Sequence, residues 1–107
     1  MKIIFNELTK AYLSELIDIL YYNHYFSIEE NAREYVRSLV REVETTHPLR
    51  RKRESPKYFY RYGNNLWYAT YRKNKRTTWY FFFTHHETNI YIIRYITNNH
   101  VAGHLLE

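Results

Sequence analysis

Ten lysine and arginine side chains lie between positions 50 and 76, interspersed with tyrosines, and together they could bind a polyanion. Cationic groups neutralise phosphates. Exposed rings stack on unpaired bases, which contributes about 1 to 3 kcal/mol per base. The cations are Arg50, Arg51, Lys52, Arg53, Lys57, Arg61, Arg72, Lys73, Lys75 and Arg76, and the rings that we assign to binding are Tyr60, Tyr68 and Tyr71. The pattern favours a surface for single-stranded nucleic acid. The alternative is a solvated basic loop beside rings that complete the core.

A histidine and three arginines could supply the groups that RNA cleavage needs. When a 2′-hydroxyl attacks the neighbouring phosphate, a base takes its proton, cations stabilise the added charge and an acid protonates the leaving oxygen. Histidine titrates near neutral pH, so His100 can act as acid or base. The charge can come from Arg72, Arg76 and Arg94. The alternative is that Arg94 forms an ion pair at a sheet edge and that His100 only ends a strand.

The histidines are a weak indication of a metal site. His85 adjoins His86, and His100 stands four positions before His104. Cysteine is absent and no carboxylate stands at ligand spacing beside these pairs. We therefore expect no metal and no other cofactor, and His85-His86 is typical of a polar turn.

The positive charge is concentrated in the second half of the chain. The net charge is +5, but residues 1–46 carry five lysines and arginines against eight acidic residues, whereas residues 47–107 carry eleven against three. A field of one sign attracts a polyanion or an acidic partner. Aromatic residues make up 20% of the chain, with 13 tyrosines, whose rings can be buried while the hydroxyl stays hydrated.

Length and composition bound the class of protein. A chain of 107 residues can form one hydrophobic core, so we expect a single domain over residues 1–107. The absence of cysteine fits a reducing compartment. The N-terminal apolar run is too short for a signal peptide, and no stretch reaches the roughly 20 apolar residues of a membrane span. We expect a cytoplasmic protein that does not enter the membrane.

The first half predicts a strand and two helices. The apolar residues 2–5 form a short strand. Leu13, Leu16, Ile17 and Leu20 recur at helical spacing, which predicts a helix from residue 7 to about residue 24. Ser27 and Glu30 have the spacing of a capping box, followed by a helical pattern to about residue 44. The two helices should form an antiparallel hairpin.

The second half predicts a basic loop and then a sheet. Pro48 and Pro56 bound a mobile basic loop, and residues 58–62 fit a short strand or an extended segment. Residues 66–72, 77–84 and 89–97 read as strands, the middle one buried on both faces. Their short connections make them antiparallel neighbours. The fold class is therefore α+β: an N-terminal strand, a two-helix hairpin and a three- to four-stranded antiparallel sheet with one face on the helices and the other free.

This order of elements, with its basic connection, resembles the RelE/ParE superfamily of toxins from bacterial toxin–antitoxin pairs. The resemblance covers residues 2–106 and implies a ribosome-dependent mRNA endoribonuclease whose partners are mRNA, the ribosome and a cognate antitoxin. It also implies that Arg72 and Arg76 grip phosphates and that His100 stands where the family often has its last catalytic group. The alternatives are a non-catalytic nucleic-acid-binding module and a ParE-like gyrase inhibitor that acts through protein contacts.

Overall fold

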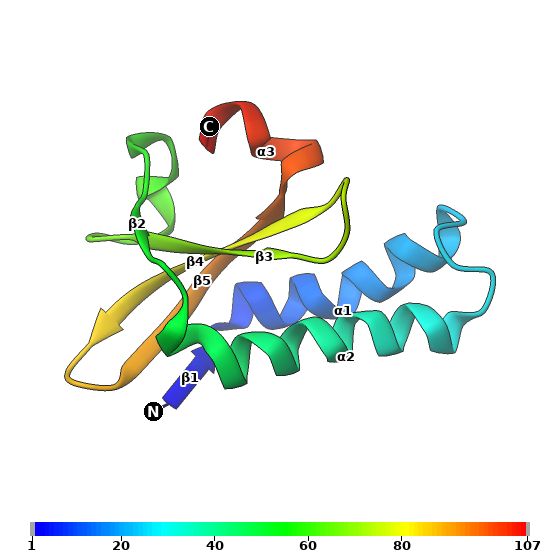
Figure 1. Cartoon of the computed structure of the whole chain (residues 1–107), viewed down its shortest axis with the longest axis horizontal. Helices are drawn as coiled ribbons and strands as arrows, with labels where there is room; N and C mark the ends of the chain where they lie inside the picture. The colour runs from blue at the N-terminus through cyan, green and yellow to red at the C-terminus, as the bar shows by residue number, and fades with distance from the viewer. Residues whose placement is uncertain (1, 107) are drawn as a thin grey trace.

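A five-stranded sheet forms the middle layer of the molecule, with a helical hairpin on one side and shorter helices on the other (Figure 1). The computed structural model describes residues 2–106, apart from the side chain of His104. The strand order is β1-β5-β4-β3-β2. β3 (Trp67–Arg72), β4 (Thr78–His86) and β5 (Ile90–Asn98) form the expected antiparallel meander. β1 (Lys2–Phe5) adds a parallel strand to β5, and β2 (Arg53–Glu54) pairs with β3.

The predicted hairpin is formed by α1 (Glu7–Tyr22) and α2 (Glu29–Thr46). α1 begins at Glu7 because the Asn6 side chain accepts a hydrogen bond from the Thr9 amide at 3.0 Å. The predicted capping box at Ser27 is wrong, since Ile28 precedes the first helical residue and no side chain caps α2. The chain enters α2 through an apolar contact instead, in which the rings of Phe26 and Tyr35 lie 5.5 Å apart.

The main core lies between the hairpin and the sheet. Every second side chain of β4 points to the helices, because successive residues of a strand face opposite ways. These side chains are buried with the apolar stripes of both helices, and the cluster includes Leu16, Leu39, Val43, Trp79, Phe81, Phe83 and Ile93. Full burial of one such side chain contributes about 1.5 to 3 kcal/mol.

The opposite side of the sheet, which we call the far side, is not free. The prediction of an uncovered face is wrong, because η2 (Lys57–Tyr62) and α3 (Asn99–Leu106) pack on it. Phe59 of η2 and Phe82 of β4 are both buried, with ring centroids 4.5 Å apart. The expected strand or extended segment at 58–62 is therefore a 3₁₀ helix that brings one ring of its turn onto the sheet.

The basic loop is more ordered than its composition suggests. It contains η1 (His47–Leu49), which continues directly from α2, and β2 at the edge of the sheet. The His47 side chain is completely buried and anchors the start of this segment. The α+β class, the hairpin and the meander are confirmed, and the differences are a mixed sheet of five strands and a layer on the far side.

Candidate nucleic-acid interface

The pairing of the strands places cationic side chains on the far side. Tyr68 belongs to the far-side cluster, and Arg72 stands four residues later on the same strand, so both point to the same side. Arg53 pairs with Tyr68 across the β2–β3 ladder and shares that orientation. Two further cations on the far side, Lys57 and Arg61, belong to η2, and both are exposed.

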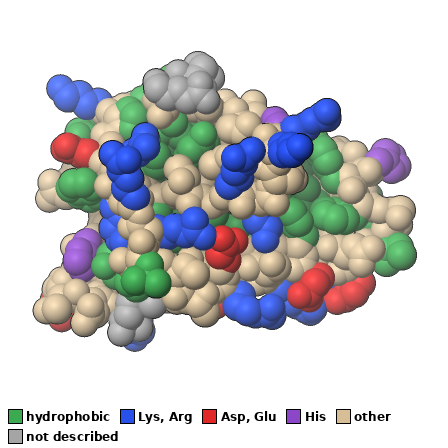
Figure 2. Space-filling model, viewed as in Figure 1, with side chains coloured by type: hydrophobic (Ala, Val, Ile, Leu, Met, Phe, Trp, Pro, Cys, Tyr) green, Lys and Arg blue, Asp and Glu red, His purple; other side chains and the backbone are tan. Residues whose placement is uncertain are grey.

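Seven cations of the predicted set are exposed and, among the residues that the structure describes, form no ion pair with a carboxylate. We call this set the basic surface. It comprises Arg51, Arg53, Lys57, Arg61, Arg72, Lys75 and Arg76. In Figure 2 separate Lys and Arg side chains are spread over the upper half of the molecule, whereas those along its lower edge lie beside acidic side chains. By contrast, the α2 arginines Arg33 and Arg37 pair with glutamates of the same helix.

Three predicted binding cations are used inside the protein instead. Arg50 forms an ion pair with Glu42 and lies over the Tyr71 ring, 4.6 Å from its centroid. Lys73 donates to the Ser38 hydroxyl and is also close to Glu42. Because both cations already have a carboxylate partner, we leave them out of the basic surface.

Lys52 is the third of these cations. Its ammonium group donates to three backbone carbonyls, those of His47, Pro48 and Arg50, and it lies 5.5 Å from the centroid of the Tyr91 ring. Burial lowers the pKa of Lys52 from its ordinary value. Its role is to close the segment between α2 and β2.

Two of the three predicted stacking rings are not available. Tyr71 is completely buried on the helix side, and only 5% of Tyr68 is exposed on the far side. The prediction that they stack on bases is therefore wrong, because alternation along β3 sends each ring into one of the two cores. Tyr60 remains, with 41% of its surface exposed, and Tyr58 is 56% exposed beside it. Arg61 lies over Tyr58, 5.0 Å from the ring centroid.

The β3–β4 turn meets the start of α3 and forms what we call the turn cluster, namely Arg72, Arg76, Thr77 and His100. The His100 Nε2 atom lies 3.2 Å from the Thr77 hydroxyl. The Asn99 side chain donates to the Arg76 carbonyl at 3.0 Å, and Arg72 donates through Nε to the Asn74 carbonyl. α3 begins here because Asn98 accepts from the amides of the first helical turn. Three of the four predicted catalytic residues thus share one end of the sheet.

Arg94 lies elsewhere, in what we call the bulge cluster, formed by Thr84, His86 and Arg94. Phe82 pairs with Tyr95 but Phe83 pairs with Ile93, so β5 has one extra residue at this point. The bulge puts Arg94 beside Thr84, whose hydroxyl accepts a hydrogen bond from Arg94 Nε at 2.8 Å. The same hydroxyl lies 2.7 Å from His86 Nε2. The distance along β5 from Arg94 to Asn98, just before α3, is about 13 Å.

His86 is the residue that sequence reasoning missed. The turn predicted at residues 85–88 is too long, since β4 continues to His86 and the turn starts after it. Alternation along the strand could have indicated this position. Every second residue of β4 faces the far side, and His86 follows Phe82 and Thr84 in that series. The exposed imidazole therefore lies on the far side with Arg94.

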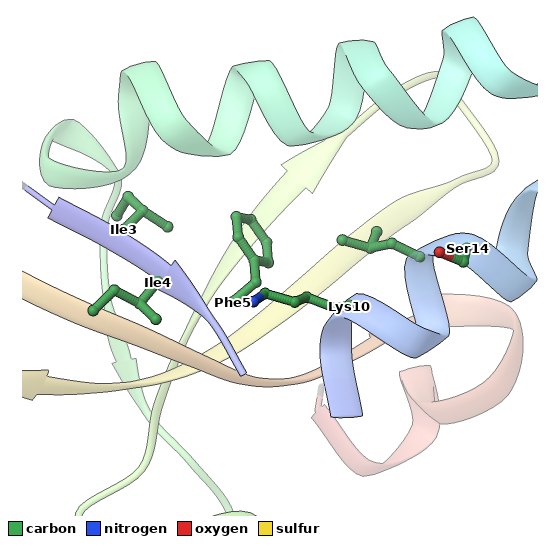
Figure 3. Close-up of a pocket in the computed structure, with 6 residues that line it drawn as sticks. Ile3, Ile4, Phe5, Lys10 and Ser14 are labelled. Atoms are coloured by element: carbon green, nitrogen blue, oxygen red, sulfur yellow. The ribbon is translucent and has the colours of Figure 1, made fainter. Parts of the chain in front are cut away.

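Of two hollows with similar volumes, one adjoins the turn cluster and the other shares no lining residue with either cluster. A groove of about 520 Å³ runs between the tip of the hairpin and the turn cluster; His100, Tyr25, Tyr35 and Trp79 are among the side chains that line it. Another, of about 510 Å³, lies between β1 and α1 and is lined by Ile3, Ile4, Phe5, Lys10, Leu13 and Ser14 (Figure 3). The second has no acid–base pair among these lining residues, so it offers no site for RNA cleavage.

Comparisons with known proteins leave the family open. No family model matches the chain, and neither the curated proteins nor the solved structures include a significant match. Within residues 2–106, no helix is both long enough and apolar enough to span a membrane. In the same part of the chain, no three histidine or carboxylate side chains cluster as metal ligands; the His104 side chain lies outside the described residues.

Proposed function

We propose that the protein binds single-stranded RNA through the basic surface and acts as the mRNA endoribonuclease toxin of a toxin–antitoxin pair, of the RelE/ParE kind. The observation that carries the proposal is the basic surface itself, whose seven exposed cations form no ion pair with any carboxylate of the described residues. The other three cations of the predicted set, Arg50, Lys52 and Lys73, are paired with a carboxylate or hydrogen-bonded within the protein. The remaining charge is therefore available to an external polyanion.

The distribution of this charge favours a nucleic acid strand over a compact anion. The β3–β4 turn carries Arg76 and Lys75, and η2 carries Lys57 and Arg61, so the cations extend over two separate elements. A strand with a phosphate at every nucleotide can contact both, and each neutralised phosphate releases counterions. Tyr58 and Tyr60, which also belong to η2, supply exposed rings for unpaired bases.

The turn cluster supports the catalytic part of the proposal. A His100 nitrogen takes the proton of the 2′-hydroxyl as its oxygen attacks the phosphorus, and the bond to the 5′-oxygen breaks as that oxygen takes a proton from water, which leaves a 2′,3′-cyclic phosphate. Arg72 and Arg76 stabilise the negative charge that develops on the phosphate. The contact with Thr77 holds the imidazole at the surface, where a bound strand can reach it.

One observation favours a second candidate, a non-catalytic nucleic-acid-binding module. Arg94 is in the bulge cluster, so the third arginine expected at the catalytic site does not meet His100. A binding module needs no such convergence. Both candidates use the basic surface, and only the toxin cuts RNA.

The test is cleavage of a defined mRNA on translating ribosomes, with the 3′ ends mapped. The wild-type protein should cut, and Arg76→Gln should cut at least tenfold more slowly. The control is Arg41→Gln, which removes an exposed arginine of α2 and should cut at the wild-type rate. RNA binding without cutting would favour the binding module, and absence of both would overturn the proposed function.

A further inference from the structure

Arg94 differs from the other partly buried cations of the chain. Over residues 2–106, five lysines and arginines are partly buried: Arg33, Arg50, Lys52, Lys73 and Arg94. Three of them face carboxylates, and Lys52 donates to three carbonyls. Arg94 donates through Nε to the Thr84 hydroxyl, and its two terminal nitrogens have no hydrogen bond or ion pair to the described residues. The terminal nitrogens of this half-buried guanidinium are therefore free to bind an external acceptor, and an anion is the partner that a guanidinium binds most strongly.

The backbone is shaped around the Arg94 side chain. The bulge in β5 turns Arg94 to the far side, next to Thr84. Gly63, which follows the last residue of η2, lies against this side chain, and a Cβ atom at Gly63 would come 2.8 Å from Arg94 Cδ and 3.4 Å from Nε. The absence of a side chain at Gly63 therefore lets the end of η2 pack closely against the Cδ and Nε atoms of Arg94.

Thr84 joins the guanidinium to an imidazole. Its hydroxyl oxygen accepts from Arg94 Nε at 2.8 Å and can donate its own hydrogen to His86 Nε2 at 2.7 Å. In this arrangement the second imidazole nitrogen, Nδ1, carries the proton and is a donor at an exposed position. Thr84 is itself buried, with 5% of its surface exposed, so it can hold both groups in a fixed relation.

We propose that Arg94 and His86 form a phosphate-binding site, with Thr84 as the positioning residue that couples them. The terminal nitrogens of Arg94 form a fork that matches two oxygens of a phosphate, and His86 Nδ1–H donates to a third. The ligand is a phosphate group, either of an RNA strand or free in solution. The identification of the ligand as a phosphate of an RNA strand rests on the proposed function. Bound in this way, the strand would be held at a point about 13 Å from the end of β5, where the turn cluster lies.

The first experiment detects phosphate at His86 by NMR of the histidine ring signals, with the protein labelled at histidine and inorganic phosphate as the probe. The His86 signal should move in a saturable way as phosphate is added and should not move with chloride at the same ionic strength. His24, exposed at the tip of the hairpin, serves as the internal control. A His86 signal that does not respond, or that responds equally to chloride, would overturn the proposed site.

The phosphate affinities of matched variants distinguish binding at this site from a general effect of charge. Arg94→Gln and Thr84→Val should each weaken phosphate binding at least about tenfold, since a lost hydrogen bond to a charged group has at least this effect. Thr84→Ser keeps the hydroxyl and should bind as the wild type does. Thermal unfolding of each variant verifies the fold. Wild-type phosphate binding by Arg94→Gln, which removes no core side chain, would overturn the proposal even if Thr84→Val fails to fold.

A second arm uses a short single-stranded RNA and fluorescence anisotropy. Weaker RNA binding by Arg94→Gln, together with the phosphate response, supports an RNA phosphate as the ligand. A phosphate response with no RNA binding by the wild type would leave the site in place and overturn the proposed function. RNA binding that is equally tight in the wild type and in Arg94→Gln, without a phosphate response, would overturn the site alone.

Discussion

The Nδ1 atom of His47 lies 2.6 Å from the hydroxyl of Tyr71, and both side chains are completely buried. The imidazole packs edge-on against Phe83 and Tyr91, with ring centroids 4.5 Å and 4.9 Å away. The other ring nitrogen, Nε2, is buried and has no hydrogen-bond partner among the described residues. His47 therefore joins the end of α2 to β3 inside the main core, and its protonation should affect folding.

Folding stability should fall as the pH drops from neutral because of His47. Burial first, and then repulsion from Lys52 and Arg50, lowers its pKa from 6.5 to about 4. Below pH 6.5 the unfolded chain takes up a proton that the folded chain does not, so stability is lost as the pH falls toward 4. The loss reaches about 3 kcal/mol at most.

The measurement is urea unfolding at about pH 7 and pH 5. The comparison is a double variant, His47→Phe with Tyr71→Phe, which removes both partners of the hydrogen bond together and keeps two rings in the core. Its stability should change much less between the two pH values. An equal loss in the wild type and the double variant would show that other groups cause the pH dependence.

The exposed ring of Tyr60 on the far side should contribute to RNA binding. Tyr60→Ala should weaken binding of single-stranded RNA by about 1 to 3 kcal/mol, because a stacked base loses its ring. Tyr22→Ala is the control, since this ring is 71% exposed at the end of α1. Anisotropy titrations give the affinities. Equal effects of the two variants would contradict a stacking role for Tyr60.

His100 should matter for cutting and not for binding. His100→Ala should slow mRNA cleavage on ribosomes by about 10² to 10⁴, the usual contribution of an acid–base group, with RNA affinity changed less than twofold. His24→Ala removes an exposed imidazole at the tip of the hairpin and should cut normally. Cleavage by His100→Ala at the wild-type rate would remove His100 from the mechanism.

Gly63→Ala should disturb Arg94 without a large effect on the fold. The added methyl would meet Arg94 Cδ at 2.8 Å, so the arginine has to move away from Thr84. We expect a loss of about 1 to 3 kcal/mol in stability and no phosphate response at His86. Gly103→Ala in α3 is the matched control, and it should keep the response. A normal His86 response in Gly63→Ala would contradict the packing described for η2.

The hairpin and the meander could be predicted because their signals are local. Leu16 and Leu20 lie on one face of α1 by spacing alone, and the continuous apolar run of β4 requires burial on both sides. The far-side layer could not be predicted in this way. A tyrosine such as Tyr68 has the same type and spacing whether it stacks on a base or is covered by another segment of the chain, and only the packing of η2 and α3 distinguishes the two.

The candidate site was predictable in composition but not in arrangement. The sequence shows the cations of the basic loop, yet the separation of Arg50 and Lys73 from the exposed ones depends on Glu42, a residue of α2 that the fold brings next to both. The bulge that turns Arg94 toward Thr84 has no signal in an apolar strand. Long-range pairing and register therefore decide which groups meet.

The most direct test of RNA binding by the basic surface compares two triple variants with the same change in net charge. One replaces Arg53, Arg61 and Arg76 with glutamine, and the other replaces Arg33, Arg37 and Arg41 of α2. The logarithm of RNA affinity is measured against the logarithm of salt concentration from about 50 to 300 mM. The first variant should have a slope shallower by about 2, at roughly 0.7 per lost phosphate contact, and the second should keep the wild-type slope. Equal slopes for the two variants would contradict RNA binding by the basic surface.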